Sequence, residues 1–128
     1  MPQSQRNAAA APVGAMEIAV VGGGSNGCTA SLLQGSESSA WTWTRLPDLL
    51  RKSERPAITF LESHKQLFVV GGNLTDSVDM EMFSFVSRAA RNAQWTGVST
   101  PPNLTRWSTH LLVLGDHLVL VCKPPSIP

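Results

Sequence analysis

The chain has 128 residues, of which 42% are hydrophobic and 15% charged, and its formal net charge is +1 at pH 7. This length and composition allow one modest hydrophobic core and imply no charged partner. The arginines and lysines are spread among different predicted turns and strand ends instead of forming one basic cluster, so we expect no nucleic-acid binding.

Residues 1–15 are rich in alanine and contain Pro2, Pro12 and Gly14. They lack the long apolar core of a secretion signal, and we predict a disordered leader. No stretch of the chain approaches the roughly twenty consecutive apolar residues that span a bilayer. We therefore expect a cytoplasmic protein that does not enter a membrane.

Short apolar or alternating segments predict β-strands along most of the remaining chain. Residues 78–85 alternate apolar with polar side chains almost perfectly, as a strand with one solvent-exposed face should. Gly115-Asp116 between two apolar runs is the clearest hairpin signal. The predicted strands are 18–21, 29–33, 41–46, 57–61, 66–70, 78–85, 94–98, 111–114 and 118–121, and residues 47–55 are predicted as a loop or a single helical turn.

An internal repeat is the most informative feature of the sequence. Ile18-Ala-Val-Val-Gly-Gly23 returns as Leu67-Phe-Val-Val-Gly-Gly72, and each copy is followed by a tryptophan, Trp43 and then Trp95. A fainter third copy spans residues 109–121, after which Cys122-Lys123 replaces the glycine pair. A β-branched run that ends in Gly-Gly and recurs at a period of about 50 residues is typical of stacked β-sheets.

The repeated unit resembles the kelch repeat. The resemblance rests on Val69-Val70-Gly71-Gly72, Trp43-Thr44-Arg45-Leu46-Pro47 and Trp95-Thr96-Gly97-Val98, and it covers most of the chain, from residue 18 to residue 122. It implies an all-β fold made of four-stranded antiparallel blades of a kelch-type β-propeller. The tyrosine that the family usually carries before the tryptophan is absent, because the chain contains no Tyr. Phe83 or Phe85 could take its position in the complete unit, and Leu33 in the first.

Counted as propeller blades, the chain holds about two and a quarter, whereas known propellers close with typically four to eight. A partial blade at 18–46, a complete blade at 57–98 and a partial blade at 109–122 lie within a repeat region of residues 16–123, which a tail at 124–128 follows. We expect the ring not to be closed. The chain is then a fragment or truncated product, or a piece that self-associates through its open blade edges.

The repeat positions are assigned structural roles. A glycine pair after a buried strand permits a positive φ or a close backbone approach. Tryptophans on successive outer strands are expected to pack one blade on the next. Trp41 alternates with Trp43 and shares its face. The structural repeat positions are Gly22, Gly23, Gly71, Gly72, Trp43 and Trp95.

An alternative reading is a dinucleotide-binding fragment, because Gly22, Gly24 and Gly27 follow a β-branched strand in the spacing of the Rossmann fingerprint. Residues 28–34 would then form a short helix, and Asp48 would be the acidic residue. The alternative explains one Gly-Gly copy, whereas the β-array explains both.

The chain has no HExxH and no CxxC pair, and we expect no nucleophile elbow of the GxSxG type. Histidines fall on hairpin ends or on a strand, and Cys28 and Cys122 are expected to be buried apolar residues. The carboxylates Glu62, Asp76, Asp79 and Glu81 follow turns and a solvent-exposed strand face. We predict no enzyme activity, no metal site and no cofactor.

Function is then expected to lie on a surface. If the strands of a blade are labelled a to d from the inside outward, the b-to-c turns and the d-to-a connections lie on the same side. Here these are residues 24–27, 47–55, 73–77 and 99–106. Kelch domains typically bind protein partners through such loops, so the resemblance implies a protein-interaction module. The predicted contacts are Asn73, Asp76, Asn103 and Arg106.

Overall fold

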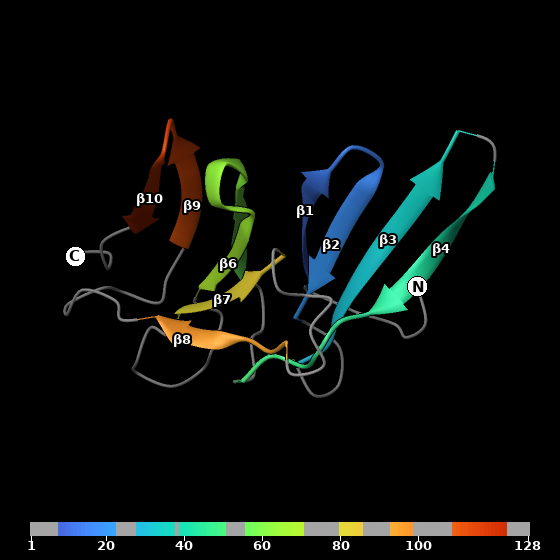
Figure 1. Cartoon of the computed structure of the whole chain (residues 1–128). Coiled ribbons are helices and arrows are strands. Elements are labelled where there is room, and N and C mark those ends of the chain that lie inside the picture. Colours follow the sequence, from blue (N-terminus) through green and yellow to red (C-terminus); the bar gives the residue numbers. More distant parts are fainter. Residues whose placement is uncertain are drawn as a thin grey trace, which may run out of the picture.

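The computed structural model describes residues 8–22, 28–37, 39–50, 56–70, 80–85, 93–98 and 109–122. They form an all-β protein with three antiparallel sheets that stand side by side and do not close a ring (Figure 1). The predicted fold class is confirmed, since this arrangement fits an open, partial β-propeller.

Sheet A has four strands in the order β1-β2-β3-β4. They are β1 (Ala9–Gly14), β2 (Glu17–Val21), β3 (Ala30–Ser36) and β4 (Ser39–Arg45). Each neighbouring pair is antiparallel, with register irregularities between Pro12 and Gly14 and between Gln34 and Ser36.

Strand β1 corrects the prediction of a disordered leader that runs to residue 15. Ala9–Gly14 pairs with β2, and it buries Ala11 and Val13 in the core. Alanine is depleted in strands and proline cannot donate to a β-ladder, so this segment carries almost no local strand signal. Pro12 is tolerated because β1 is an edge strand, which pairs with a neighbour on one side only. The first blade is therefore complete, with four strands instead of three.

Sheet B repeats this architecture in the order β5-β6-β7-β8. Its strands are β5 (Ala57–Leu61), β6 (Gln66–Val70), β7 (Met80–Ser84) and β8 (Thr96–Val98), and the short 3-10 helix η1 (Glu62–His64) connects β5 to β6. Sheet C is the hairpin of β9 (Thr109–Leu114) and β10 (His117–Cys122), which turns at Gly115-Asp116 as predicted.

Two layers of apolar side chains hold the three sheets together. Sheet A contributes small residues such as Ala19 and Ala30 to the first layer, and sheet B contributes the larger Leu67, Phe83 and Trp95. The second layer lies between sheets B and C and includes Phe68, Val70, Met80 and Leu111. Along each strand alternate side chains point to opposite faces, so sheet B is packed on both of its faces.

Met16, in the two-residue turn between β1 and β2, has a φ of 63°. A side chain in this left-handed region is strained because its Cβ approaches the following carbonyl oxygen. Met16 is also exposed, so it gains little from packing.

Met16→Gly is therefore expected to stabilise the protein by about 1 kcal/mol, the relieved strain less the added freedom of glycine in the unfolded chain. Urea unfolding followed by circular dichroism measures the change. Ala15→Gly, in the same turn but not at a positive φ, is the matched control and should lose roughly 0.5–1 kcal/mol. A destabilised Met16→Gly variant would contradict this account of the turn.

Candidate functional site

The segment that follows β4 forms the seam between sheets A and B. Leu46 and Leu49 are buried in the first core layer. Their backbone N–H groups donate to the carbonyl oxygens of Ala30 and Cys28, at 3.0 and 2.8 Å. These bonds fix residues 46–50 to sheet A and leave other backbone groups of the segment directed at sheet B.

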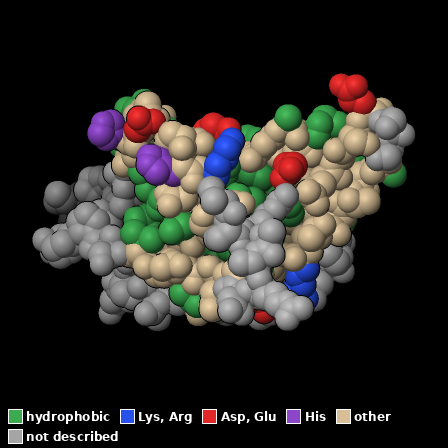
Figure 2. Space-filling model, viewed as in Figure 1, with side chains coloured by type: hydrophobic (Ala, Val, Ile, Leu, Met, Phe, Trp, Pro, Cys, Tyr) green, Lys and Arg blue, Asp and Glu red, His purple; other side chains and the backbone are tan. Residues whose placement is uncertain are grey.

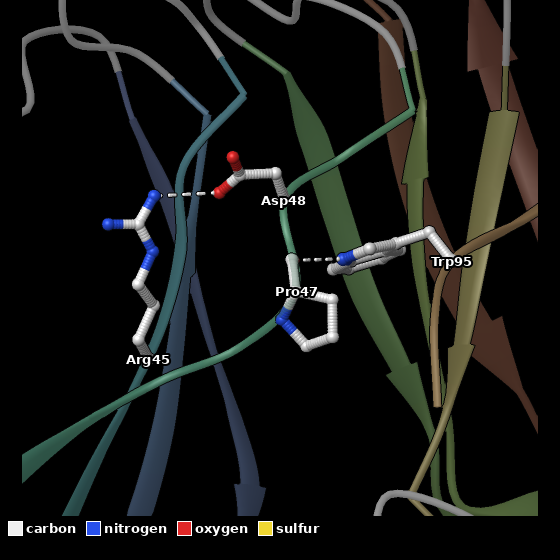
Figure 3. A network of polar contacts seen from close by, with 4 residues as sticks. All are labelled: Arg45, Pro47, Asp48 and Trp95. Carbon is white, nitrogen blue, oxygen red and sulfur yellow. Dashed lines mark hydrogen bonds and ion pairs between the residues drawn. The ribbon is translucent and has the colours of Figure 1, made fainter. Parts of the chain in front are cut away.

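Sheet B contacts this segment through two polar side chains. The indole Nε1 of Trp95 donates to the carbonyl oxygen of Pro47 at 2.8 Å (Figure 3). The backbone N–H of Leu50 donates to the carboxylate Oε1 of Glu81 at 2.6 Å. On the same segment, Arg45 and Asp48 form an exposed ion pair at 2.9 Å. The seam therefore joins the sheets by directed hydrogen bonds as well as by apolar packing.

A row of aromatic rings extends from Trp95 along the face of sheet B that meets sheet A. Trp95 lies 5.3 Å from Phe83, measured between ring centroids, and Phe83 lies 5.3 Å from Phe85. Phe60 continues the row at 5.8 Å from Phe85, edge to face. Such offset and T-shaped pairs are the favourable geometries for aromatic rings.

The prediction that tryptophans pack one sheet on the next is confirmed for Trp95, which is 2% exposed. Trp43 occupies the same repeat position on β4 and is half-buried. It points away from sheet B, and no sheet covers it among the described residues. Trp41 shares that face, and its ring lies over Gly35, where a Cβ would come within 2.5 Å of the indole.

The described glycine of the repeat positions supports the structural reading. Gly22 has a φ of 75°, is buried, and its N–H donates to the carbonyl oxygen of Thr29 at 2.8 Å. Gly23, Gly71 and Gly72 lie outside the described residues.

The dinucleotide-binding alternative is wrong for this fold. Its fingerprint requires a helix directly after the glycines and a parallel crossover. Residues 30–36 instead form strand β3, which pairs with β2 in antiparallel register. Gly24 and Gly27 lie outside the described residues, so their own conformation does not enter the argument.

Glu81 was expected on the solvent-exposed face of its strand, and this expectation is wrong. The residue is 5% exposed. The apolar–polar alternation breaks at Met82-Phe83, so Glu81 shares its face with Phe83, and sheet A covers that face. The only sign in the sequence of its hydrogen bond to Leu50 is that Glu81 is a polar residue between two apolar ones, Met80 and Met82.

The four predicted partner contacts, Asn73, Asp76, Asn103 and Arg106, lie outside the described residues. The strand ends that bound their segments are described, and they lie together. Val21 pairs with Ala30, and Val70 pairs with Met80, which in turn pairs with Val98 at the end of β8. The end of β2, the start of β3 and the end of β6 lie toward the lower side of Figure 1, as does the start of β9. The described turns at Ala15-Met16, η1 and Gly115-Asp116 occupy the upper side.

The described residues contain no cluster of three or more His, Cys, Asp or Glu side chains that could hold a metal ion. His64 is exposed, with its Nδ1 at 2.9 Å from the Ser63 hydroxyl, and His117 is exposed on β10. Glu62 and Lys65 form an exposed ion pair beside η1.

Exposed apolar side chains occur on both outer sheets, A and C, and Figure 2 shows hydrophobic side chains among polar ones on one side of the molecule. On sheet C, Leu112 is 51% and Leu114 is 64% exposed. On sheet A, Ile18 is 36% exposed and lies on the face opposite sheet B.

No protein-family model matches this sequence, and no curated protein is significantly similar to it. Among the described residues, no helix is long and apolar enough to cross a membrane.

Trp95→Phe is expected to destabilise the protein by about 2 kcal/mol, because it removes ring volume from a filled core and leaves the Pro47 carbonyl without its donor. Trp43→Phe, at the same repeat position on an open face, should cost less than about 0.5 kcal/mol. Urea unfolding of both variants measures the difference. Equal losses in the two would contradict the assigned role of Trp95.

Glu81→Met is expected to lose about 2 kcal/mol, since it removes the part-buried hydrogen bond from the N–H of Leu50 to the carboxylate. Glu81→Gln keeps an oxygen at this position and should lose roughly half as much. Glu37→Met, at an exposed turn, should stay within about 0.5 kcal/mol of the parent protein. The account fails if Glu81→Met unfolds at the same urea concentration as Glu37→Met.

Proposed function

We propose that the chain is a piece of a kelch-type β-propeller that binds a protein partner and catalyses no reaction of its own. The observation that carries the proposal is topological. The described strand ends that bound residues 23–27, 51–55, 71–79 and 99–108 lie on one side of the three sheets. Segments from different sheets then contribute to a single surface.

The internal repetition supports the kelch assignment. The register Ile18–Leu33–Trp43 in sheet A corresponds to Leu67–Phe83 in sheet B, with Trp95 next in line. Leu33 and Phe83 are therefore at equivalent positions, and both are among the residues, with Phe85, that the resemblance offers for the family's tyrosine. The Leu-Pro that follows Trp43-Thr-Arg has a use here, because Leu46 fills the core and Pro47 accepts the indole hydrogen bond.

A binding role for the connecting segments agrees with the general pattern that strands form the packed scaffold and loops carry recognition. Both faces of sheet B and one face of sheet A are packed in the two core layers. Loops on a rigid scaffold carry most recognition in such folds, because their side chains are free of packing constraints. Asn73, Asp76, Asn103 and Arg106 offer amide, carboxylate and guanidinium groups suited to polar contacts.

Simultaneous replacement of these four residues by alanine tests the proposal. A protein partner is first identified by cross-linking mass spectrometry, and its affinity for each purified variant is then measured by calorimetry. The expected loss is at least tenfold, about 1.4 kcal/mol, because several polar contacts are removed at once.

The matched control replaces Glu62, Ser63, His64 and Asp116 by alanine. These exposed residues lie at turns on the opposite side of the sheets. Partner affinity should be unchanged in the control. A quadruple loop variant that binds as tightly as the control would rule out the loop surface as the contact site.

A further inference from the structure

Sheets A, B and C are stacked in one sense, so each has a face that points to the preceding sheet and a face that points to the following one. We call the first the leading face and the second the trailing face. The leading face of sheet B (Leu67, Phe83, Trp95) packs on sheet A, and its trailing face (Phe68, Val70, Met80) packs on sheet C. We propose that the trailing face of sheet C docks on the leading face of sheet A in a second copy of this chain.

The leading face of sheet A is the counterpart of a surface that is buried elsewhere in the same molecule. Pro12 pairs with Ile18, and Ile18 with Leu33. In sheet B the corresponding row is Phe60, Leu67 and Phe83. The row in sheet B is covered by sheet A, whereas Pro12 and Ile18 are exposed and Leu33 is half-buried. Equivalent positions therefore present an apolar row with no sheet against it among the described residues.

Ser31 marks the same face in an independent way. It is 1% exposed, and within the described part of the chain its hydroxyl has no hydrogen-bond partner. Ser31 pairs with Val20, as Glu81 pairs with Val69, so the two residues occupy equivalent positions. At this position sheet B accepts a hydrogen bond from the backbone of the preceding sheet. Ser31 is itself covered, and the leading faces of sheets A and B thus carry a buried polar residue at the same position.

The trailing face of sheet C has the matching character. Leu111, Val113 and Leu118 point to sheet B. The alternate residues Leu112, Leu114, Val119 and Val121 point the other way, and Val121 is 45% exposed. They correspond to the trailing face of sheet B, where Phe68 and Val70 are buried. Wherever a trailing face is packed among the described residues, it is packed against the leading face of the next sheet.

The second copy is the occupant because its leading face continues the interfaces already formed. The A–B and B–C contacts each place a leading face on a trailing face, and a C–A contact between copies repeats that step. Two leading faces or two trailing faces would instead meet in an arrangement that the sheets of the described residues do not show. The contact is heterologous, since each copy contributes a different surface. Sheet C has two strands, so it covers the inner strands β1 and β2 of its partner, where Pro12 and Ile18 lie.

Two single substitutions separate the two surfaces. Ile18→Glu blocks the leading face of sheet A, and Leu112→Glu blocks the trailing face of sheet C. Each places an unpaired carboxylate in an apolar contact and should weaken self-association by at least ~100-fold. Met16→Glu is the matched control, because Met16 is 40% exposed on a turn outside both faces. Circular dichroism and urea unfolding check that all variants fold like the parent protein.

Sedimentation equilibrium on the full chain gives the decisive result. The parent protein and Met16→Glu should associate as concentration rises, and each blocked variant alone should remain a monomer. An equimolar mixture of the blocked variants should form a complex of two copies, since one supplies an intact trailing face and the other an intact leading face. The proposal is overturned if either blocked variant associates alone as the parent does, if the mixture stays monomeric, or if the parent itself does not associate. Partner affinity of the loop variants is measured separately, so failure here leaves the proposed function standing.

Discussion

The structure depends on one constraint: a β-sheet with apolar side chains on both faces must be covered on both. Sheet B meets this condition, with Leu67 and Phe83 against sheet A and Phe68 and Val70 against sheet C. Sheets A and C each have one packed face and one face that exposes apolar residues. Since apolar burial is the main stabilising term in folding, the central sheet organises the array. The two outer sheets carry the surfaces available for further association.

Shape and hydrogen bonding together fix how sheets A and B meet. Sheet A presents small side chains, Ala11, Ala19 and Ala30, and sheet B fills the space opposite with an aromatic row. Large against small residues allow close approach at native packing density. The bonds from Trp95 to Pro47 and from Leu50 to Glu81 add direction, which apolar contact lacks. A shift of one sheet along the other would break both bonds.

The repeat shows how one sequence pattern serves two environments. Trp43 and Trp95 follow the same motif at similar distances, yet one is half-buried on an open face and the other is enclosed at the seam. Ser31 and Glu81 form a second such pair, one without and one with a partner across an interface. The differences arise from what lies against each sheet and not from the strands themselves. A residue at a repeat position can take part in a sheet interface, but it does so only where a neighbouring sheet packs against it.

The sequence alone determined the strands and their order, because β-branched runs, alternation and glycine-rich turns are local signals. It located β5 and β6 to the residue and the β9–β10 turn at Gly115-Asp116. It missed β1, whose alanines and Pro12 have low strand propensity and form a strand only by pairing with β2. It placed Glu81 in solvent and gave Trp43 and Trp95 one role. Only the tertiary structure decided these points, because burial depends on which sheet covers a face, and period-two alternation is the same whether a face meets water or another sheet.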